Sequence, residues 1–326
     1  MRVRASVVVP TFKRPDLLER CLAALVAQNF DPATYEIIIV DDANSQETRQ
    51  QVECWSRQMH LHRYTICYVP VTGISHGPSV ARNLGWRAAA GEVIAFTDDD
   101  CVPDANWLNA GVAAFADNIV GASGRILVPL TDMPTDYEYN AAQLEQCEFA
   151  TANCFYHRDA LIMVGGFDER FTDPWREDSD LFFTFLERKF RCIAVSDAVV
   201  LHPVRPVRWG ICLQQQRKSM FNALLYKKHP HLYRQKIQAT PPWQYYGIVV
   251  VLLFVLIGSV KRVRPLVFGG VGLWGCLTAR FCLQRLRYTS HTPRHVIEML
   301  ITSLAIPPLA IFWRLRGAIK FRVFFL

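Results

Sequence analysis

Short apolar runs alternate with amphipathic segments along the first hundred residues of the chain. Four of these runs have the length and apolar content of buried strands, and they cover residues 4–10, 35–40, 64–71 and 93–96. The segments between them carry helix signals, in residues 15–26, 45–59 and 80–90. Strands that alternate with helices in this way predict an α/β fold, with a mostly parallel sheet and flanking helices.

The last third of the chain has a different pattern, with three apolar stretches at residues 245–260, 266–279 and 296–313. A spanning helix needs about 20 apolar residues, and these stretches are shorter. Aromatic residues at their boundaries favour interfacial or re-entrant helices in a membrane surface. Burial as ordinary core helices is the alternative, but it would leave many basic residues unpaired. We expect one domain over residues 1–230 and a membrane-associated helical region over residues 231–326.

Charge divides the chain of 326 residues at a similar place. Residues 203–326 hold 19 Lys and Arg and a single acid, Glu298, whereas residues 1–202 hold 17 bases and 28 acids. A basic, apolar tail suits an anionic membrane surface. Nucleic acid is not the expected partner, because the bases are interleaved with apolar runs instead of clustering on a polar domain. The ten cysteines include no C-x-x-C pair, which argues against a zinc site.

The start of the chain bears on its compartment. Residues 1–10 run directly into a predicted strand, without an apolar segment of signal-peptide length. We therefore expect the first part of the chain to stay in the cytoplasm, and the whole protein to lie on the cytoplasmic face of a membrane.

Polar side chains follow the predicted strands. The run at residues 93–96 stops at Asp98, Asp99 and Asp100. Alternation along an extended backbone puts Asp98 and Asp100 on one side, where two carboxylates can hold Mg²⁺ or Mn²⁺. The alternative interpretation is a solvated acidic turn. Thr11 and Asp41 follow two other strands, and ligands of parallel α/β sheets bind outside the carboxyl ends of strands, so these residues predict a single site.

Six motifs occur in a recognisable order along residues 4–230. They are Val7-Val-Val-Pro-Thr-Phe-Lys-Arg-Pro15, Ile37-Ile-Ile-Val-Asp-Asp-Ala-Asn44, Ala81-Arg-Asn-Leu-Gly85 with Gly91-Glu92, Phe96-Thr-Asp-Asp-Asp100, Gly165-Gly-Phe-Asp-Glu169 and Glu177-Asp-Ser-Asp-Leu181. Together they resemble a family 2 glycosyltransferase of the GT-A fold, the nucleotide-diphospho-sugar transferase architecture. A glycine-rich dinucleotide turn and a G-x-x-x-x-G-K-[ST] phosphate loop are both missing from the sequence.

The resemblance implies a nucleotide-sugar donor at the strand ends. Arg82 would approach the diphosphate, where a guanidinium can bind phosphate oxygens bidentately. Its alternative is an exposed helix cation, and the alternative for Asp41 is a turn or helix-capping residue. The donor residues implied are Pro10, Thr11, Arg14, Asp41, Asp42, Arg82, Asn83, Asp98 and Asp99.

The resemblance also implies a metal site and an acceptor side. Asp98 and Asp100 would form a D-x-D motif for Mn²⁺ or Mg²⁺, with His202 as a further ligand or, alternatively, a solvated residue. Asp178 would act as the general base, and Glu177 or Asp180 could carry that role instead. Acidic residues at a helix N-terminus also cap helices, which is the structural alternative. Acceptor contacts are expected at Asn153, Arg158, Trp175 and Asp180, while Arg176 stands where family members often have glycine.

The function implied is an inverting, metal-dependent glycosyltransferase. It would move a sugar from a nucleotide-sugar to a hydroxyl of a lipid-linked or cell-envelope glycan, as in polysaccharide biosynthesis. Two alternatives remain open from the residues alone, a nucleotidyltransferase and a non-catalytic membrane scaffold. The first usually has a glycine-rich basic loop after its first strand, which residues 10–15 do not supply, and intact acidic motifs argue against the second.

Overall fold

The computed structural model describes residues 2–116 and 118–325 and divides the chain into two compact units. The first comprises residues up to Pro129 together with Ala142–Val204, and the second comprises Leu130–Ala141 and Arg205–Leu326. The division therefore differs from the predicted one at residue 230. Residues 205–230 belong to the second unit because they pack on its last helix, where Lys227 Nζ donates to Phe321 O at 2.8 Å.

The first unit is built on a mixed sheet, whose eight strands among the described residues follow the order β3-β2-β1-β4-β7-β6-β8-β5. Strands β3, β2, β1 and β4 are parallel, whereas β7 runs antiparallel to β4 and β6, and β5 runs antiparallel to β8. The strand bounds are β1 Ala5–Thr11, β2 Tyr35–Asp41, β3 Thr65–Pro70, β4 Val93–Phe96, β5 Val102–Pro103, β6 Ile119–Leu127, β7 Cys154–His157 and β8 Arg191–Leu201.

Strand order reverses between β1 and β4, since the chain first builds outward from β1 to β3 and then returns to β4 on the other side of β1. Such a switch point leaves a crevice outside the carboxyl ends of the strands. Thr11 ends β1, and Asp98 to Asp100 follow β4. The fold therefore places the predicted polar clusters at one edge of the sheet.

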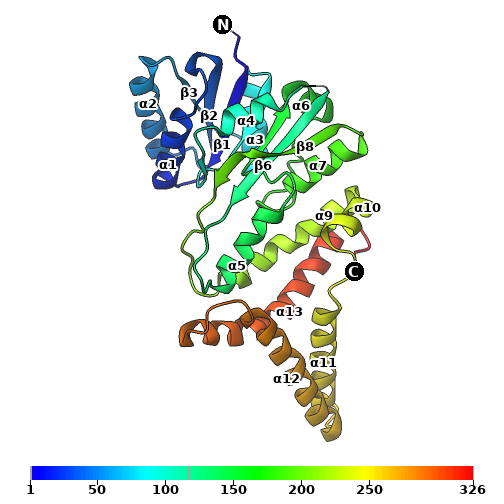
Figure 1. The fold of residues 1–326 in the computed structure, drawn as a ribbon. Coiled ribbons are helices and arrows are strands. Elements are labelled where there is room, and N and C mark those ends of the chain that lie inside the picture. Colours follow the sequence, from blue (N-terminus) through cyan, green and yellow to red (C-terminus); the bar gives the residue numbers. More distant parts are fainter. Residues whose placement is uncertain (1, 117, 326) are drawn as a thin grey trace. The chain divides into compact units, whose positions relative to one another are not determined.

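Helices flank this sheet, as the alternating pattern predicts (Figure 1). Their bounds are α1 Pro15–Val26, α2 Gln46–His60, α3 Pro78–Ala88, α4 Trp107–Ala113, α6 Arg158–Val164 and α7 Glu177–Glu187, with 3₁₀ turns η1 Pro32–Thr34 and η2 Gln143–Gln146. The predicted strands at residues 4–10, 35–40, 64–71 and 93–96 and the three helices between them are confirmed. Their apolar faces form the core, in which Val7, Leu22 and Ile37 are completely buried.

The second unit is helical. Its shorter elements are α5 Asp136–Ala142, α8 Ile211–Gln215, η3 Gln216–Met220, α9 Phe221–Lys228, α10 Pro230–Leu232 and η4 Tyr233–Ile237, and its long helices are α11 Trp243–Val260, α12 Arg264–Leu286 and α13 Pro293–Phe321. These three have 18, 23 and 29 residues and are apolar enough to cross a membrane by length and composition. The expectation that they are too short is wrong, because α12 extends to Leu286 and α13 continues through Pro307 and Pro308.

A buried ion pair joins the inserted segment 130–141 to these helices. Asp136 accepts from Arg285 Nη2 at 2.7 Å, and Arg285 Nη1 donates to Thr302 Oγ1 at 2.8 Å. Both charged side chains are 9% exposed. Removing one partner of such a pair leaves an uncompensated buried charge, so this contact specifies where the segment attaches.

Candidate active site

The acidic turn after β4 is held from the first strand. Thr11 Oγ1 donates to Asp99 Oδ2 at 2.8 Å, and Arg14 Nη1 lies 3.1 Å from Asp99 Oδ1. Burial raises the pKa of Asp99, Arg14 opposes the rise, and Asp100 adds to it. The structure thus brings three predicted donor residues together, with Pro10 beside them in β1.

Arg82 of α3 connects the acidic turn to the start of α7. Its Nη2 lies 2.9 Å from Asp98 Oδ1, and its Nη1 lies 2.9 Å from Glu177 Oε1. The alternative of an exposed helix cation does not hold in this structure, because the Arg82 side chain is only 4% exposed. Burial alone would lower the pKa of Arg82, but Asp98 and Glu177 outweigh burial and raise it. Arg82 is therefore a permanent cation between two carboxylates.

Glu177 and Asp178 have different surroundings at the first turn of α7. Glu177 is 3% exposed and committed to Arg82. Burial raises the pKa of Glu177 to about 7, Arg82 opposes the rise, and Asp178 adds to it. Asp178 is half-buried, and its Oδ1 accepts from Ser179 N at 2.6 Å. Its Oδ2 accepts no hydrogen bond from any residue that the structure describes, so Asp178 has an oxygen available for a proton.

Arg176, which precedes this turn, has a left-handed backbone with φ of 77°. Glycine adopts that conformation without the steric cost that an L side chain meets. The guanidinium of Arg176 lies 4.5 Å from the ring centroid of Trp175, whose side chain is exposed. The left-handed conformation explains why a glycine would suit position 176. Trp175 remains a predicted acceptor contact.

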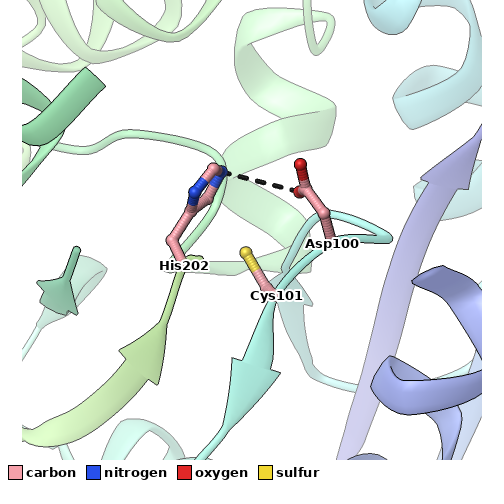
Figure 2. A group of neighbouring side chains, drawn as sticks. All are labelled: Asp100, Cys101 and His202. Atoms are coloured by element: carbon pink, nitrogen blue, oxygen red, sulfur yellow. Dashed lines mark ion pairs between the residues drawn. The ribbon is translucent and has the colours of Figure 1, made fainter. Parts of the chain in front are cut away.

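A possible metal cluster lies where the acidic turn meets the end of β8. His202 Nε2 lies 3.5 Å from Asp100 Oδ1. Figure 2 shows Cys101 beside this pair, and ligand atoms of the three residues lie within 4.8 Å of one another. Carboxylate oxygen and imidazole nitrogen are donors that divalent cations such as Mn²⁺ accept, so this donor set fits a cation. Asp98, the other predicted ligand, is outside this cluster and pairs with Arg82.

The sequence argument missed Cys101, whose thiol is completely buried. Burial raises the pKa of that thiol, and Asp98 and Asp100 add to the rise. A search for C-x-x-C spacing cannot find a cluster built from one cysteine, one aspartate and a histidine a hundred residues away.

The two carboxylates at the end of β2, Asp41 and Asp42, accept hydrogen bonds from other groups of the protein. Asp41 is completely buried and accepts from Ser45 N at 2.7 Å and from the Tyr68 hydroxyl at 3.0 Å. The buried, hydrogen-bonded position of Asp41 matches the alternative that it is a turn or helix-capping residue. Asp42 accepts from Gly77 N at 3.0 Å, and its Oδ1 lies 3.0 Å from His76 Nδ1. Asp42 therefore joins the β2 end to the start of α3.

Asn83 and Gly166 form a packing contact. Asn83 Nδ2 donates to Phe167 O at 2.8 Å, and its Oδ1 accepts from Phe167 N at 2.9 Å. A Cβ on Gly166 would lie 2.5 Å from Asn83 Oδ1, and the φ of Gly166 is 77°. Because Asn83 is 1% exposed and paired with this loop, the structure does not bring it to the donor site.

Three of the predicted acceptor residues are buried or lie at the other edge of the sheet. Asn153 is completely buried, and its amide is paired with Trp107 and two backbone carbonyls. Arg158 begins α6 next to Glu92, at the amino end of β4 and so at the opposite edge of the sheet. Asp180 is 2% exposed. Sequence order places Asn153 and Arg158 between the metal strand and the base, but the Asn153 side chain is buried and Arg158 lies at the other edge of the sheet.

A comparison of the sequence with protein families decides the class of protein. The model for Glycosyl transferase family 2 matches residues 6–167, which include most of β1, Arg82 and the acidic turn. The chain belongs to glycosyl transferase family 2. It is therefore a glycosyltransferase, and the nucleotidyltransferase and scaffold alternatives are wrong.

Two characterised relatives and one solved structure illustrate the family. Glycosyltransferase AglE of Haloferax volcanii is 23% identical over 223 residues, which make up 65% of this chain and 70% of AglE. Hyaluronan synthase of Pasteurella multocida is 29% identical over 277 residues, but this alignment spans 72% of the present chain and only 28% of the synthase. The mannosyltransferase PcManGT from Pyrobaculum calidifontis, solved with GDP-Man and Mn²⁺, gives a TM-score of 0.59 at 18% identity and covers 99% of this chain and 88% of its own. The likeness confirms the predicted GT-A fold.

Proposed function

We propose that this family 2 glycosyltransferase moves a sugar from a nucleoside diphosphate to a hydroxyl of a cell-envelope glycan or lipid-linked acceptor, with a divalent cation and with inversion. The observation that carries the proposal is the pairing of Asp100 with His202 at 3.5 Å, beyond the carboxyl ends of β4 and β8. Two relatives support the acceptor class by name, hyaluronan synthase and the poly(ribitol-phosphate) β-N-acetylglucosaminyltransferase TarS of Staphylococcus aureus.

The donor half of the proposal uses residues at the ends of β1 and β4. Thr11 and Arg14 fix Asp99, and Arg82 provides a permanent positive charge behind Asp98. A diphosphate adds negative charge at this edge, where Arg82 and Arg14 form ion pairs with Asp98 and Asp99. Preorganised charge of this kind stabilises a leaving group without reorganisation during the reaction.

The cation would be held by Asp100 and His202, with Asp98 as the further predicted ligand. It would act as a Lewis acid that neutralises the departing nucleoside diphosphate. The solved mannosyltransferase contains GDP-Man and Mn²⁺, which supports a nucleotide-sugar and a cation of this kind.

On the acceptor side, Asp178 is the base that removes the hydroxyl proton. Its Oδ2 is unpaired among the described residues, whereas Glu177 is bound to Arg82. Direct attack of that hydroxyl on the anomeric carbon inverts the configuration. Trp175 is exposed near the same turn and can stack on a sugar ring.

Membrane attachment is proposed for the second unit. Helices α11, α12 and α13 are each long and apolar enough to cross a bilayer, and residues 203–326 carry 19 bases. A basic region of this kind suits the anionic surface of the cytoplasmic leaflet. We place the enzyme on the cytoplasmic face.

Thermal unfolding of the full chain in detergent tests the donor site. UDP, GDP and their sugars are screened with Mn²⁺, with Mg²⁺ and with EDTA. A ligand at about 100 times its dissociation constant adds about 2.7 kcal/mol to the free energy of unfolding. The proposal is supported if one nucleotide stabilises the protein only when the cation is present. This stabilisation should be lost in Asp100→Asn and kept in the control Asp104→Asn, which changes an exposed residue. A folded protein that responds to no nucleotide contradicts it, and a product of retained anomeric configuration contradicts inversion.

A further inference from the structure

The cation cluster contains a sulfur atom that the proposed reaction does not use. Cys101 follows Asp100 in the chain, and His202 comes from the end of β8 a hundred residues later. Figure 2 shows the Cys101 sulfur beside both side chains, and the three ligand atoms lie within 4.8 Å of one another. Cys101 is completely buried, so its thiol packs inside the protein beside the other two side chains of the cluster.

The register of the sheet sets this arrangement. Strands β5 and β8 are antiparallel, with Val102 opposite Leu201 and Pro103 opposite Val200. Extending this register by one residue puts Cys101 opposite His202. Residues directly opposite each other in an antiparallel pair point their side chains to the same face. The proximity of the thiol and the imidazole therefore follows from backbone pairing.

The distances between the three candidate ligand atoms can be compared with the distances between ligand atoms around a coordinated ion. For tetrahedral Zn²⁺, bonds of about 2.1 Å to nitrogen and oxygen and about 2.3 Å to sulfur place nitrogen about 3.4 Å from oxygen and sulfur about 3.6 Å from each. The His202 Nε2 to Asp100 Oδ1 distance is 3.5 Å, already close to that value. The sulfur lies within 4.8 Å of a ring nitrogen of His202 and of a carboxylate oxygen of Asp100, so about 1 Å of approach completes the geometry.

We propose that Cys101 is a third ligand of this site and that the site binds a thiophilic divalent cation, such as Zn²⁺ or Co²⁺, when no donor is bound. The inference rests on the proposed cation site and adds a selectivity to it. Thiolate favours soft and borderline cations, whereas carboxylate suits Mg²⁺ and Mn²⁺. The thiol proton passes to solvent as the metal–sulfur bond forms, and three protein ligands leave a fourth position open. Zn²⁺ held here competes with the activating cation and inhibits transfer.

Titration of the nucleotide-free full chain with Co²⁺ tests the sulfur ligand directly. We expect a sulfur-to-Co²⁺ charge-transfer band in the near ultraviolet together with the visible d–d bands. Cys101→Ser and Cys101→Ala lose the charge-transfer band and keep d–d absorption, whereas Cys54→Ser and Cys147→Ser, at exposed cysteines, keep both. Competition with Co²⁺ then gives the Zn²⁺ affinity, which falls at least about tenfold in the Cys101 variants, while the Mn²⁺ affinity stays within about threefold.

The ratio of the Zn²⁺ affinity to the Mn²⁺ affinity distinguishes metal ligation by Cys101 from a folding defect. Equal losses of Zn²⁺ and Mn²⁺ affinity in the Cys101 variants would show that Cys101 only supports the fold, and would overturn the inference. Wild-type protein with d–d bands and no charge-transfer band would also overturn it, but would leave the cation site intact. Folded wild-type protein that binds no Co²⁺ would overturn both the inference and the proposed cation site.

Discussion

Arg82 Nη1 lies 2.9 Å from Glu177 Oε1, and each of the two side chains is only 4% exposed. A buried cation and a buried carboxylate from α3 and α7 thus neutralise each other beside the acidic turn. The same guanidinium reaches Asp98 through Nη2 at 2.9 Å. Loss of Arg82 would force Glu177 either to remain as an uncompensated buried charge or to take up a proton, which makes this pair a structural requirement as well as a feature of the site.

Arg82→Gln should therefore lower the free energy of unfolding by about 3–5 kcal/mol, the usual cost of breaking a buried ion pair. The control is Arg87→Gln on the same helix, whose ion pair with Glu169 spans 3.6 Å and whose side chain is 50% exposed, so that about 0–1 kcal/mol is expected. Denaturant unfolding in detergent measures both. A double-mutant cycle with Glu177→Gln should give a coupling of about 0.5–3 kcal/mol. Additive losses would show that the two residues do not stabilise each other.

The raised pKa of Glu177 gives a pH dependence with a definite sign. Its pKa is about 7 in the fold, against a value of 4.5 for the free side chain. Between these values the folded state binds more protons than the unfolded state, so the contribution of Glu177 to stability is present at low pH and is lost as pH rises from 4.5 to 7. The slope is at most about 1.4 kcal/mol per pH unit.

Unfolding measured from pH 4.5 to 8 in wild type and Glu177→Gln tests this sign. The difference between the two proteins should change with pH over that interval, while Glu53→Gln, at an exposed carboxyl, should not alter the profile. A difference that does not vary with pH would mean that Glu177 has the same pKa in both states.

Asp178→Asn should reduce kcat by about 10²–10⁴ and leave donor binding unchanged, because a base acts on the acceptor hydroxyl only during transfer. Glu187→Gln at the other end of α7 is the control and should keep kcat. Single-turnover transfer and nucleotide-dependent thermal shifts measure the two quantities separately. Loss of donor binding in Asp178→Asn, or an unchanged kcat, would assign the base role elsewhere.

Local patterns predicted much of the catalytic unit, because apolar alternation depends on the sequence around each element. β1, β2 and α1 form where residues 4–40 predict them, and the strand-end rule places Thr11 and Asp99 together. Partners that come from distant strands were not predictable in this way. Cys101 meets His202 only through the β5–β8 register.

The interior position of Asn153 has a similar cause. The β6–β8 pairing shifts register between Gly124 and Arg125, which leaves carbonyl groups out of the ladder. Asn153 Nδ2 donates to Arg125 O and Ala198 O, each at 2.9 Å, and so satisfies carbonyls on both sides of the irregularity. No sequence motif predicts an irregularity of this kind. Asn153, whose buried amide has a structural role, was therefore predicted from the sequence to contact an acceptor.

Asn153→Ala should lower the free energy of unfolding by about 2–4 kcal/mol, because each buried polar group left unpaired costs about 1–3 kcal/mol. Asn109→Ala, at an exposed asparagine of α4, should change stability by no more than about 0.5 kcal/mol. The KM for the acceptor should be unchanged in the folded fraction of Asn153→Ala. A raised KM with normal stability would restore Asn153 as an acceptor contact.

Arg176 allows a test of backbone strain at the acceptor turn. Its φ of 77° costs an L side chain about 1–2 kcal/mol, whereas glycine avoids this cost but loses about 0.4–1 kcal/mol through the greater freedom of the unfolded chain. Arg176→Gly and Arg176→Ala both remove the stacking on Trp175, so the difference between them isolates the backbone effect. Arg176→Gly should be the more stable of the two by about 0.5–1 kcal/mol in denaturant unfolding. An alanine variant of equal or greater stability would show that α7 begins without backbone strain at position 176.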